Sequence, residues 1–213
     1  MKHRMLFWLK NVRWILVGMV AFFLILLPWL SKLTSENQLW DYNTFNNYVT
    51  YLYGTLPFAC VIANLLIQKE YVDGGAREIL IKDHADIGMT LTNTILQMVM
   101  FLALYFYFDD SYGEVTNLLT EIVVITFFMN GIAMAVTYVT REPAITILLT
   151  LGYTVICNGK IFELVSEVVI PWRITTIRGE GLDSPYYVNF LVIGIVAWVI
   201  GITQAMRGKC RFT

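Results

Sequence analysis

The stretch Lys69–Asp86, with the sequence KEYVDGGAREILIKDHAD, interrupts a chain that is otherwise largely apolar. Nine of its eighteen residues carry or can carry a charge near neutral pH, and long apolar segments flank it on both sides. Its apolar residues recur at i, i+4, i+7 and i+8, the spacing of one helix face. The sequence therefore predicts two membrane helices joined by an amphipathic helix at the water interface, whose apolar face is Val72, Ala76, Ile79 and Leu80.

The composition places the chain among membrane proteins. Of its 213 residues 57% are hydrophobic and 15% are charged, and the mean hydropathy is +0.62, whereas soluble domains carry about 25% charged residues. We therefore expect an all-α polytopic membrane protein with one transmembrane domain over residues 1–213. A net charge of −1 without a basic stripe argues against nucleic acid as a partner. Three scattered cysteines form neither a disulfide framework nor a metal-binding spacing.

Six apolar segments alternate with polar connections, and we expect each of them to cross the membrane. They are residues 14–30, 48–68, 87–108, 118–140, 144–159 and 188–206. Before them, Met1–Arg13 interleaves basic and apolar residues, which predicts an amphipathic helix on the membrane surface. No small-residue cleavage site follows the first segment, so we expect it to be retained. We expect Ser31–Asn47 to be a loop and residues 141–143 to form a tight turn.

The distribution of Lys and Arg predicts the orientation of the chain. Six crossings put both termini on one side, together with the stretch Lys69–Asp86. That side carries eleven of the fifteen Lys and Arg residues, and the other side carries four. Because basic residues are enriched in cytoplasmic loops, we expect both termini to be cytoplasmic in a multi-pass protein of the cell membrane.

A search for catalytic motifs finds none. The two histidines, His3 and His84, are far apart in the sequence, and no zinc-protease, CxxC or phosphate-loop pattern occurs. Gly74-Gly75 is not followed by the GKS or GKT of a nucleotide-binding loop. We therefore expect no enzymatic activity, no metal site and no cofactor in this chain, and any ATP-driven step would need a separate ATPase.

Polar residues inside the apolar segments are the remaining functional candidates. They are Asn64, Asn93, Gln97, Glu121 and Asn130. Hydrogen bonding between helices, worth about 0.6–2 kcal/mol for each bond, is the alternative explanation for the amides. We expect Glu121 to lie near the outer interface, where a carboxylate is easily hydrated. Without a chain of buried ionisable groups, the sequence argues against a proton-coupled carrier.

The charged stretch resembles the first cytoplasmic connection of ABC-2-type transporter permeases, which carries the pattern E-x-x-x-G-t-x-E-x-L between the second and third helices. Glu70, Gly74, Glu78 and Leu80 match it, whereas Gly75 and Arg77 depart from it. The family's N-terminal amphipathic helix and six spans agree with the pattern above. The family also has short re-entrant helices between the fifth and sixth spans, on the outer side, which corresponds here to residues 160–187.

The resemblance implies two partners besides the lipid bilayer. One is a cytoplasmic ABC ATPase, which would bind ATP and Mg²⁺, and the other is a second permease subunit that would form a homodimer with this chain. The helix of residues 69–86 would couple ATP-driven motion of the ATPase to the spans. The coupling residues implied by the resemblance are Glu70, Val72, Gly74, Ala76, Arg77, Glu78, Ile79 and Leu80.

The resemblance also implies a substrate path lined by the second and fifth spans, between the paired subunits. Its candidate residues are Phe58, Val61, Asn64, Thr146, Leu149, Leu151 and Tyr153. Their apolar and aromatic character favours export of an amphipathic or hydrophobic cargo, and the compact chain is similar to permeases that export peptides such as phenol-soluble modulins. A drug, lipid, ion or polysaccharide cargo is the alternative. An immunity or sensor protein that binds an antimicrobial peptide without pumping it is the alternative function.

Overall fold

The computed structural model describes residues 14–35, 41–72, 85–108, 114–158 and 185–210. Within these ranges every regular element is helical and no strand occurs. The elements are η1 (Phe22–Leu26), α2 (Leu27–Thr34), α3 (Tyr42–Val72), α5 (Ala85–Met100), η3 (Phe101–Phe106), α6 (Glu114–Thr140), α7 (Pro143–Asn158) and α8 (Pro185–Cys210). The predicted surface helix Met1–Arg13, residues 73–84 of the charged stretch and residues 160–184 lie outside the described residues.

Five helical stretches in the described part of the chain are long and apolar enough to cross a membrane, which identifies a multi-pass membrane protein. They are Trp14–Thr34, Tyr42–Lys69, Asp86–Phe106, Glu114–Thr140 and Tyr186–Arg207. The predicted fifth span corresponds to α7, which is apolar but shorter than these five. The structure therefore confirms an all-helical multi-pass protein. The predicted sixth crossing requires that the shorter helix α7 also spans the membrane.

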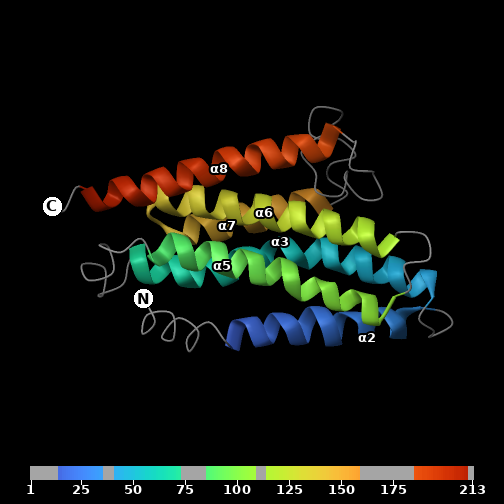
Figure 1. The fold of residues 1–213 in the computed structure, drawn as a ribbon. Coiled ribbons are helices and arrows are strands. Elements are labelled where there is room, and N and C mark those ends of the chain that lie inside the picture. Colours follow the sequence, from blue (N-terminus) through green and yellow to red (C-terminus); the bar gives the residue numbers. More distant parts are fainter. Residues whose placement is uncertain (1–13, 36–40, 73–84, 109–113, 159–184, 211–213) are drawn as a thin grey trace.

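The helices run side by side along one axis and alternate in direction (Figure 1). The central helix is α3, which packs against α2, α5, α6 and α7. The helix α8 lies on the outer side of α6 (Figure 1). The carboxyl ends of α3, α6 and α8 and the start of α5 lie together at one end of the bundle, which we call the α3 C-terminal end (Figure 1).

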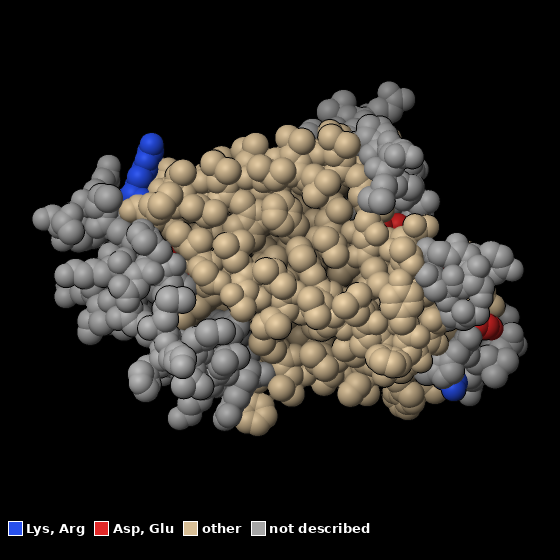
Figure 2. All heavy atoms as spheres, in the orientation of Figure 1, with Lys and Arg blue, Asp and Glu red and all other residues tan. Residues whose placement is uncertain are grey.

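The outer surface of this bundle is apolar between two charged ends. On the face drawn in Figure 2, the middle of the described surface shows no charged side chain, and blue and red atoms appear only toward the ends. Large apolar side chains point outward along the spans. Examples are Ile25, Leu102, Leu148 and Val199, which are exposed by 62%, 54%, 68% and 55%. Such a band is what lipid tails would contact.

The predicted loop Ser31–Asn47 is too long. The helix α2 continues to Thr34, and the hydroxyl of Ser31 donates to the Leu27 carbonyl at 2.8 Å, so a serine is accommodated inside the helix. The helix α3 begins at Tyr42, because the carboxylate of Asp41 accepts a hydrogen bond from the backbone N–H of Thr44 at 2.9 Å and caps the helix. Polar side chains at these ends therefore extend both helices.

The expected start of the coupling helix is also corrected. The helix α3 is continuous to Val72, so Lys69–Val72 extend the second span instead of beginning a separate helix. At the other end of the stretch, Ala85 and Asp86 already belong to α5. The tight turn between α6 and α7 is confirmed, with Arg141 at φ 60° after the last helical residue, in the left-handed conformation common at helix C-termini.

Close contact between α6 and α8 depends on glycine. A Cβ built on Gly131 would lie 2.8 Å from Cδ1 of Trp198 and 2.9 Å from the backbone oxygen of Gly194. A Cβ on Gly201 would lie 2.8 Å from Cγ of Met134. Small residues at such positions let membrane helices approach each other closely and gain dispersion energy where water cannot drive association.

This packing predicts opposite effects for two glycine-to-alanine substitutions. Gly131→Ala should destabilise the protein by about 1–3 kcal/mol, because its methyl group meets backbone that cannot move freely. Gly152→Ala is the matched control, since a Cβ there meets nothing within 4 Å, and it should be neutral or stabilising by up to about 1 kcal/mol because alanine favours helix. Thermal unfolding of both variants in one detergent measures the difference, and equal midpoints would contradict the packing argument.

Candidate functional site

Polar side chains gather in the interior of the bundle, where α3, α5 and α6 face one another. Each of these side chains is at most 4% exposed, whereas the opposite face of α5 carries exposed Leu91, Ile95 and Val99. On α5 the polar residues recur at i, i+3, i+4 and i+7, so they occupy one helix face. We call this set the polar core: Asn64, Gln68, Thr90, Asn93, Thr94, Gln97, Thr126 and Asn130.

One part of the polar core joins α3 to α5. The amide nitrogen of Asn93 donates to Oδ1 of Asn64 at 2.6 Å. The amide nitrogen of Asn64 in turn donates to the hydroxyl of Thr94 at 3.3 Å, and that hydroxyl donates to the backbone carbonyl of Thr90 at 2.9 Å. These bonds tie two neighbouring turns of α5 to one turn of α3 and so set the register between the two helices.

A second part of the polar core adds α6. The amide nitrogen of Asn130 donates to Oε1 of Gln97 at 2.8 Å, and the amide nitrogen of Gln97 reaches the backbone carbonyl of Cys60 at 3.4 Å. The Cys60 thiol points to the hydroxyl of Thr126 at 3.7 Å. The side chain of Gln97 therefore contacts both α3 and α6, and this second set of bonds joins all three helices.

The polar core has hydrogen-bonding capacity that the present arrangement does not use. Within the described residues, both amide atoms of Gln68, the Thr90 hydroxyl and Oδ1 of Asn93 and of Asn130 are buried and have no hydrogen-bond partner. Buried polar groups in this condition are unfavourable by about 1–3 kcal/mol each. A shift of α3 against α5 would therefore have donors and acceptors available to form a different set of bonds.

Two buried carboxylates lie at opposite ends of this interior. Asp86 is 1% exposed and accepts a hydrogen bond from the hydroxyl of Tyr138 at 2.6 Å. Glu121 is 2% exposed and accepts one from the hydroxyl of Tyr53. On α6, Glu121 and Tyr138 are separated by about 25 Å at 1.5 Å per residue. The polar interior thus extends over most of the thickness of a bilayer, about 30 Å.

The position of Glu121 corrects the expectation of a hydrated carboxylate near the interface. Its side chain is turned into the bundle because it occupies the face of α6 that packs on α3, and Tyr53 on α3 supplies the hydroxyl. With Asp86 also buried, the sequence argument against proton coupling loses its premise, since that argument assumed that no carboxylate is enclosed.

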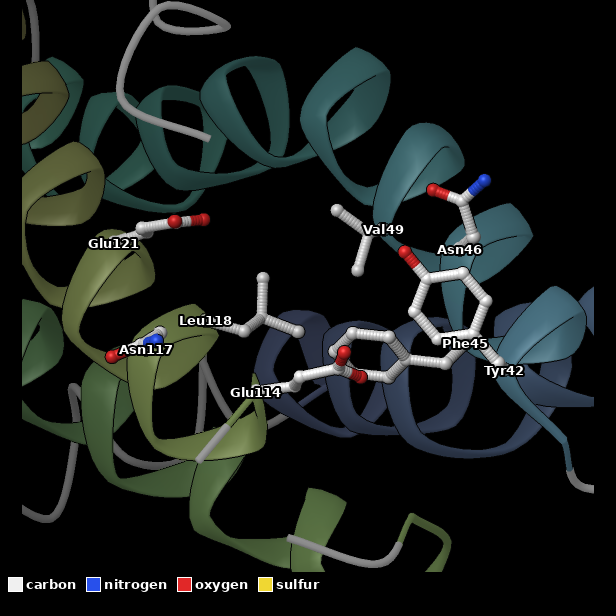
Figure 3. A pocket seen from close by; sticks show the side chains of 8 residues that line it. All are labelled: Tyr42, Phe45, Asn46, Val49, Glu114, Asn117, Leu118 and Glu121. Atoms are coloured by element: carbon white, nitrogen blue, oxygen red, sulfur yellow. The ribbon is translucent and has the colours of Figure 1, made fainter. Parts of the chain in front are cut away.

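A pocket of about 260 Å³ opens beside Glu121, between the first turns of α3 and α6. Figure 3 shows the side chains of Glu114 and Glu121 on α6 and, across the space from them, those of Tyr42 and Phe45 on α3. This end of the bundle is the one opposite the α3 C-terminal end (Figure 1). We call this hollow the acidic pocket; the other residues that line it are Asn46, Val49, Asn117 and Leu118.

A larger apolar hollow runs along α3 between the first helical stretch, Trp14–Thr34, and α7. It consists of two adjoining parts of about 460 and 620 Å³, which share Gly54, Thr55 and Thr154. We call the two parts together the lateral groove. Its walls are apolar side chains together with a few threonine hydroxyls, and it lies on the lipid-facing side of α3. Other residues that line it include Phe22, Phe58, Ile62, Tyr51, Leu151 and Val155.

The predicted substrate-path residues do not share one surface. Phe58 and Leu151 line the lateral groove, as predicted for the second and fifth spans. Val61 and Asn64 are buried at 1% and 0% exposure and face away from the groove. The structure therefore brings the two predicted elements, α3 and α7, into contact, but only part of the predicted residue set reaches the hollow between them.

The other predicted residues on α7 differ in the same way. Thr146 is buried and shares a 2.9 Å hydrogen bond with Thr137 on α6. Leu149 is 56% exposed on the outer surface, and Tyr153 packs its ring against Phe128 at 6.3 Å between centroids. The residues predicted on this one helix therefore lie on different faces, and that difference depends on the neighbouring helices.

Of the predicted coupling residues, Glu70 and Val72 belong to the last turn of α3. The others lie outside the described residues: Gly74, Ala76, Arg77, Glu78, Ile79 and Leu80. Their role in coupling stays a prediction. Within the described residues no group of three or more His, Cys, Asp and Glu side chains is arranged to hold a metal ion.

Several site residues were missed by sequence reasoning. Gln68 and Thr90 continue the spacing of Asn64 and Asn93 by one turn, and this periodicity would have identified them. Thr154 follows Thr146 and Thr150 at intervals of four residues on α7, which marks one helix face in the same way. The partnership of Tyr53 with Glu121 had no comparable signal, because 68 residues separate them.

Comparison with models of protein families, with curated proteins and with solved structures found no match. The function is therefore argued from the residues and the geometry described above.

The polar core predicts energetic coupling between Asn64 and Asn93. A double-mutant cycle that changes each to alanine should give an interaction energy of about 0.6–2 kcal/mol, because the two amides share a hydrogen bond inside the membrane. Unfolding of the single and double variants by denaturant in mixed micelles measures it.

The matched control pairs Asn64→Ala with Thr92→Ala. Thr92 lies on α5 next to Asn93, but it is half-buried outside the polar core, and its hydroxyl donates to the Gly88 carbonyl of its own helix at 2.8 Å. Its cycle with Asn64 should be additive within about 0.5 kcal/mol. Additivity in the Asn64 and Asn93 cycle as well would contradict the role of the polar core in fixing the helix register.

Proposed function

We propose that the chain is the membrane-spanning subunit of an ATP-driven exporter of the ABC-2 type, and that two copies form the path for an amphipathic peptide. The observation that carries the proposal is the lateral groove, which lies between α3 and α7, the second and fifth apolar helices of the chain. The sequence resemblance implies a cargo path lined by these two elements. In a single chain the groove opens to the lipid, and a second copy facing it would enclose a channel.

The chemistry of the groove suits an amphipathic cargo. Phe22, Phe58, Ile62 and Leu151 supply apolar walls, which would hold the hydrophobic face of a helix or lipid-like chain. The hydroxyl of Thr55 bonds to the carbonyl of Tyr51 at 2.9 Å, which leaves its oxygen able to accept a hydrogen bond from a passing polar group. A purely apolar groove would favour lipid alone.

The distribution of charge supports a cytoplasmic position for the α3 C-terminal end. Three described basic residues lie at this end: Lys69 in the last turn of α3, Arg141 directly after α6, and Arg207 near the end of α8 (Figure 1). At the other end, Lys32 lies in the last turn of α2. By the positive-inside rule the first three face the cytoplasm. With α7 as the fifth crossing, all six spans alternate, and both termini are cytoplasmic in the cell membrane.

The segment 73–84, which we call the docking segment, joins α3 to α5 in the sequence, and the end of α3 and the start of α5 lie at that same end of the bundle (Figure 1). A cytoplasmic ATPase that binds ATP and Mg²⁺ would dock there, through the face of Ala76, Ile79 and Leu80 and the anchor Glu78. The bonds of Asn64 with Asn93 and Thr94 then tie the two helices on either side of the docking segment. A push on the segment would move α3 and α5 together, and α3 forms one wall of the groove.

The coupling role predicts that Glu78→Lys combined with Ile79→Asp uncouples transport from ATP hydrolysis. The double change removes the acidic anchor and puts a charge on the apolar docking face, so a loss of ATPase association of at least about tenfold is expected, equal to about 1.4 kcal/mol or more. Co-purification with a candidate ABC ATPase subunit and ATPase activity in proteoliposomes measure the effect.

Glu114→Lys is the control for charge reversal, because Glu114 begins α6 at the opposite end of the bundle. It should leave ATPase association unchanged. Intact association and transport in the Glu78 and Ile79 double variant would refute the coupling role. Peptide binding without ATPase association or transport, in the unchanged protein as in the double variant, would favour the non-pumping immunity or sensor protein, which does not need the charged stretch.

The groove predicts a second effect that does not depend on the docking segment. Thr55→Phe places a ring in the space shared by both parts of the groove. It should lower peptide export at least about tenfold while ATPase association is retained, because the ring occupies space that the cargo would need. Ile95→Phe, on the exposed face of α5, should export normally. Equal export by the two variants would place the cargo path elsewhere.

A further inference from the structure

The acidic pocket lies at the end of the bundle opposite the α3 C-terminal end, and its features do not follow from the proposed function. Its volume is about 260 Å³, slightly below the range of about 300–1,000 Å³ typical of sites for drug-sized molecules. The pocket narrows from exposed Tyr42, Asn46 and Asn117 at its mouth to buried Val49 and Leu118 inside. A small group attached to a short apolar stem fits such a shape.

The charge of the pocket is negative. Glu114 and Glu121 are seven residues apart on α6, which puts both carboxylates on the same helix face, two turns apart. Glu121 is 2% exposed, and the hydroxyl of Tyr53 holds its carboxylate in place. Glu114 is half-buried nearer the mouth (Figure 3). None of the eight described lining residues is Lys, Arg or His, so the pocket favours a cation.

The wall opposite the carboxylates is aromatic. Tyr42 and Phe45 are three residues apart on α3 and line the pocket from the same side (Figure 3). The ring of Phe45 is held edge-on against the ring of Phe108, with 5.1 Å between their centroids. An aromatic face attracts an organic cation by about 0.5–2 kcal/mol, with the larger values where the cation is desolvated.

We propose that the acidic pocket binds a primary alkylammonium group. The carboxylates of Glu114 and Glu121 would accept hydrogen bonds from its N–H groups, the rings of Tyr42 and Phe45 would face its charge, and Val49 would contact its alkyl stem. A bare divalent metal ion fits less well, because it requires several oxygen ligands on all sides, whereas one side of this pocket is carbon. The inference does not depend on an ATPase partner.

Titration of butylammonium chloride into the purified full-length protein, in nanodiscs of zwitterionic phosphatidylcholine, tests the proposal. Isothermal titration calorimetry should show saturable binding at one site per chain. Butanol, which has the same stem but no charge, should bind at least tenfold more weakly, and so should sodium ion, which gains little from an aromatic wall.

Two isosteric variants locate the site. Glu121→Gln should weaken butylammonium binding at least tenfold, and its amide oxygen can still accept the hydrogen bond of Tyr53. Glu114→Gln should weaken binding as well, and it changes a half-buried side chain in the first turn of α6, where folding is least at risk. The matched control is Glu142→Gln, an exposed acid at the other end of α6, which should bind as the unchanged protein does.

Unchanged binding in both the Glu121 and Glu114 variants would overturn the proposal, as would equal affinity for butanol and butylammonium. Equal weakening by Glu142→Gln would show that only the overall charge of the protein matters, which also overturns it. Loss of binding in Glu114→Gln alone, with the Glu121 variant folded and binding normally, would contradict the assignment of the buried carboxylate. None of these results depends on transport, so they are separate from the tests of the exporter.

Discussion

The hydrogen bond from Asn93 to Asn64, at 2.6 Å between the amide nitrogen and the amide oxygen, is the interaction on which the described bundle most depends. In hydrocarbon a polar side chain must find its partner within the protein, since no water replaces it. Apolar packing alone distinguishes poorly between registers of two membrane helices, because lipid tails are as apolar as leucine. The paired amides provide the distinction and place the rest of α3 and α5 relative to each other.

The other contacts of the bundle follow once α3 and α5 are in register. Gln97 lies one turn beyond Asn93 and so meets Asn130, which places α6. On its other side α6 packs against α8. Gly131 on α6 and Gly194 on α8 have no side chains, which allows the two backbones to approach each other closely. Polar pairing thus holds the inner helices, and small residues hold the outer one. Both kinds of contact stabilise helix association in lipid, where no hydrophobic driving force acts between helices.

The lateral groove and the acidic pocket lie on different sides of α3 and have opposite character. The lateral groove is apolar and faces the lipid, and the acidic pocket is charged and opens at one end of the bundle. The acidic pocket depends on the extra length of α3. Its first turns, capped by Asp41, carry Tyr42 and Phe45 beyond the ends of the neighbouring apolar segments and form one wall of the pocket.

The sequence by itself determined the class of the fold, the order of the helices and the approximate ends of most of them, because apolar runs of this length are stable only as membrane helices. It also identified Asn64, Asn93, Gln97 and Asn130 as notable, since each is a polar residue in an apolar run. It did not determine which of them pair, nor that Glu121 is buried, because pairing depends on which faces of distant segments meet. The lateral groove and the acidic pocket were decided only by the tertiary structure, since each is a space between helices that no single segment contains.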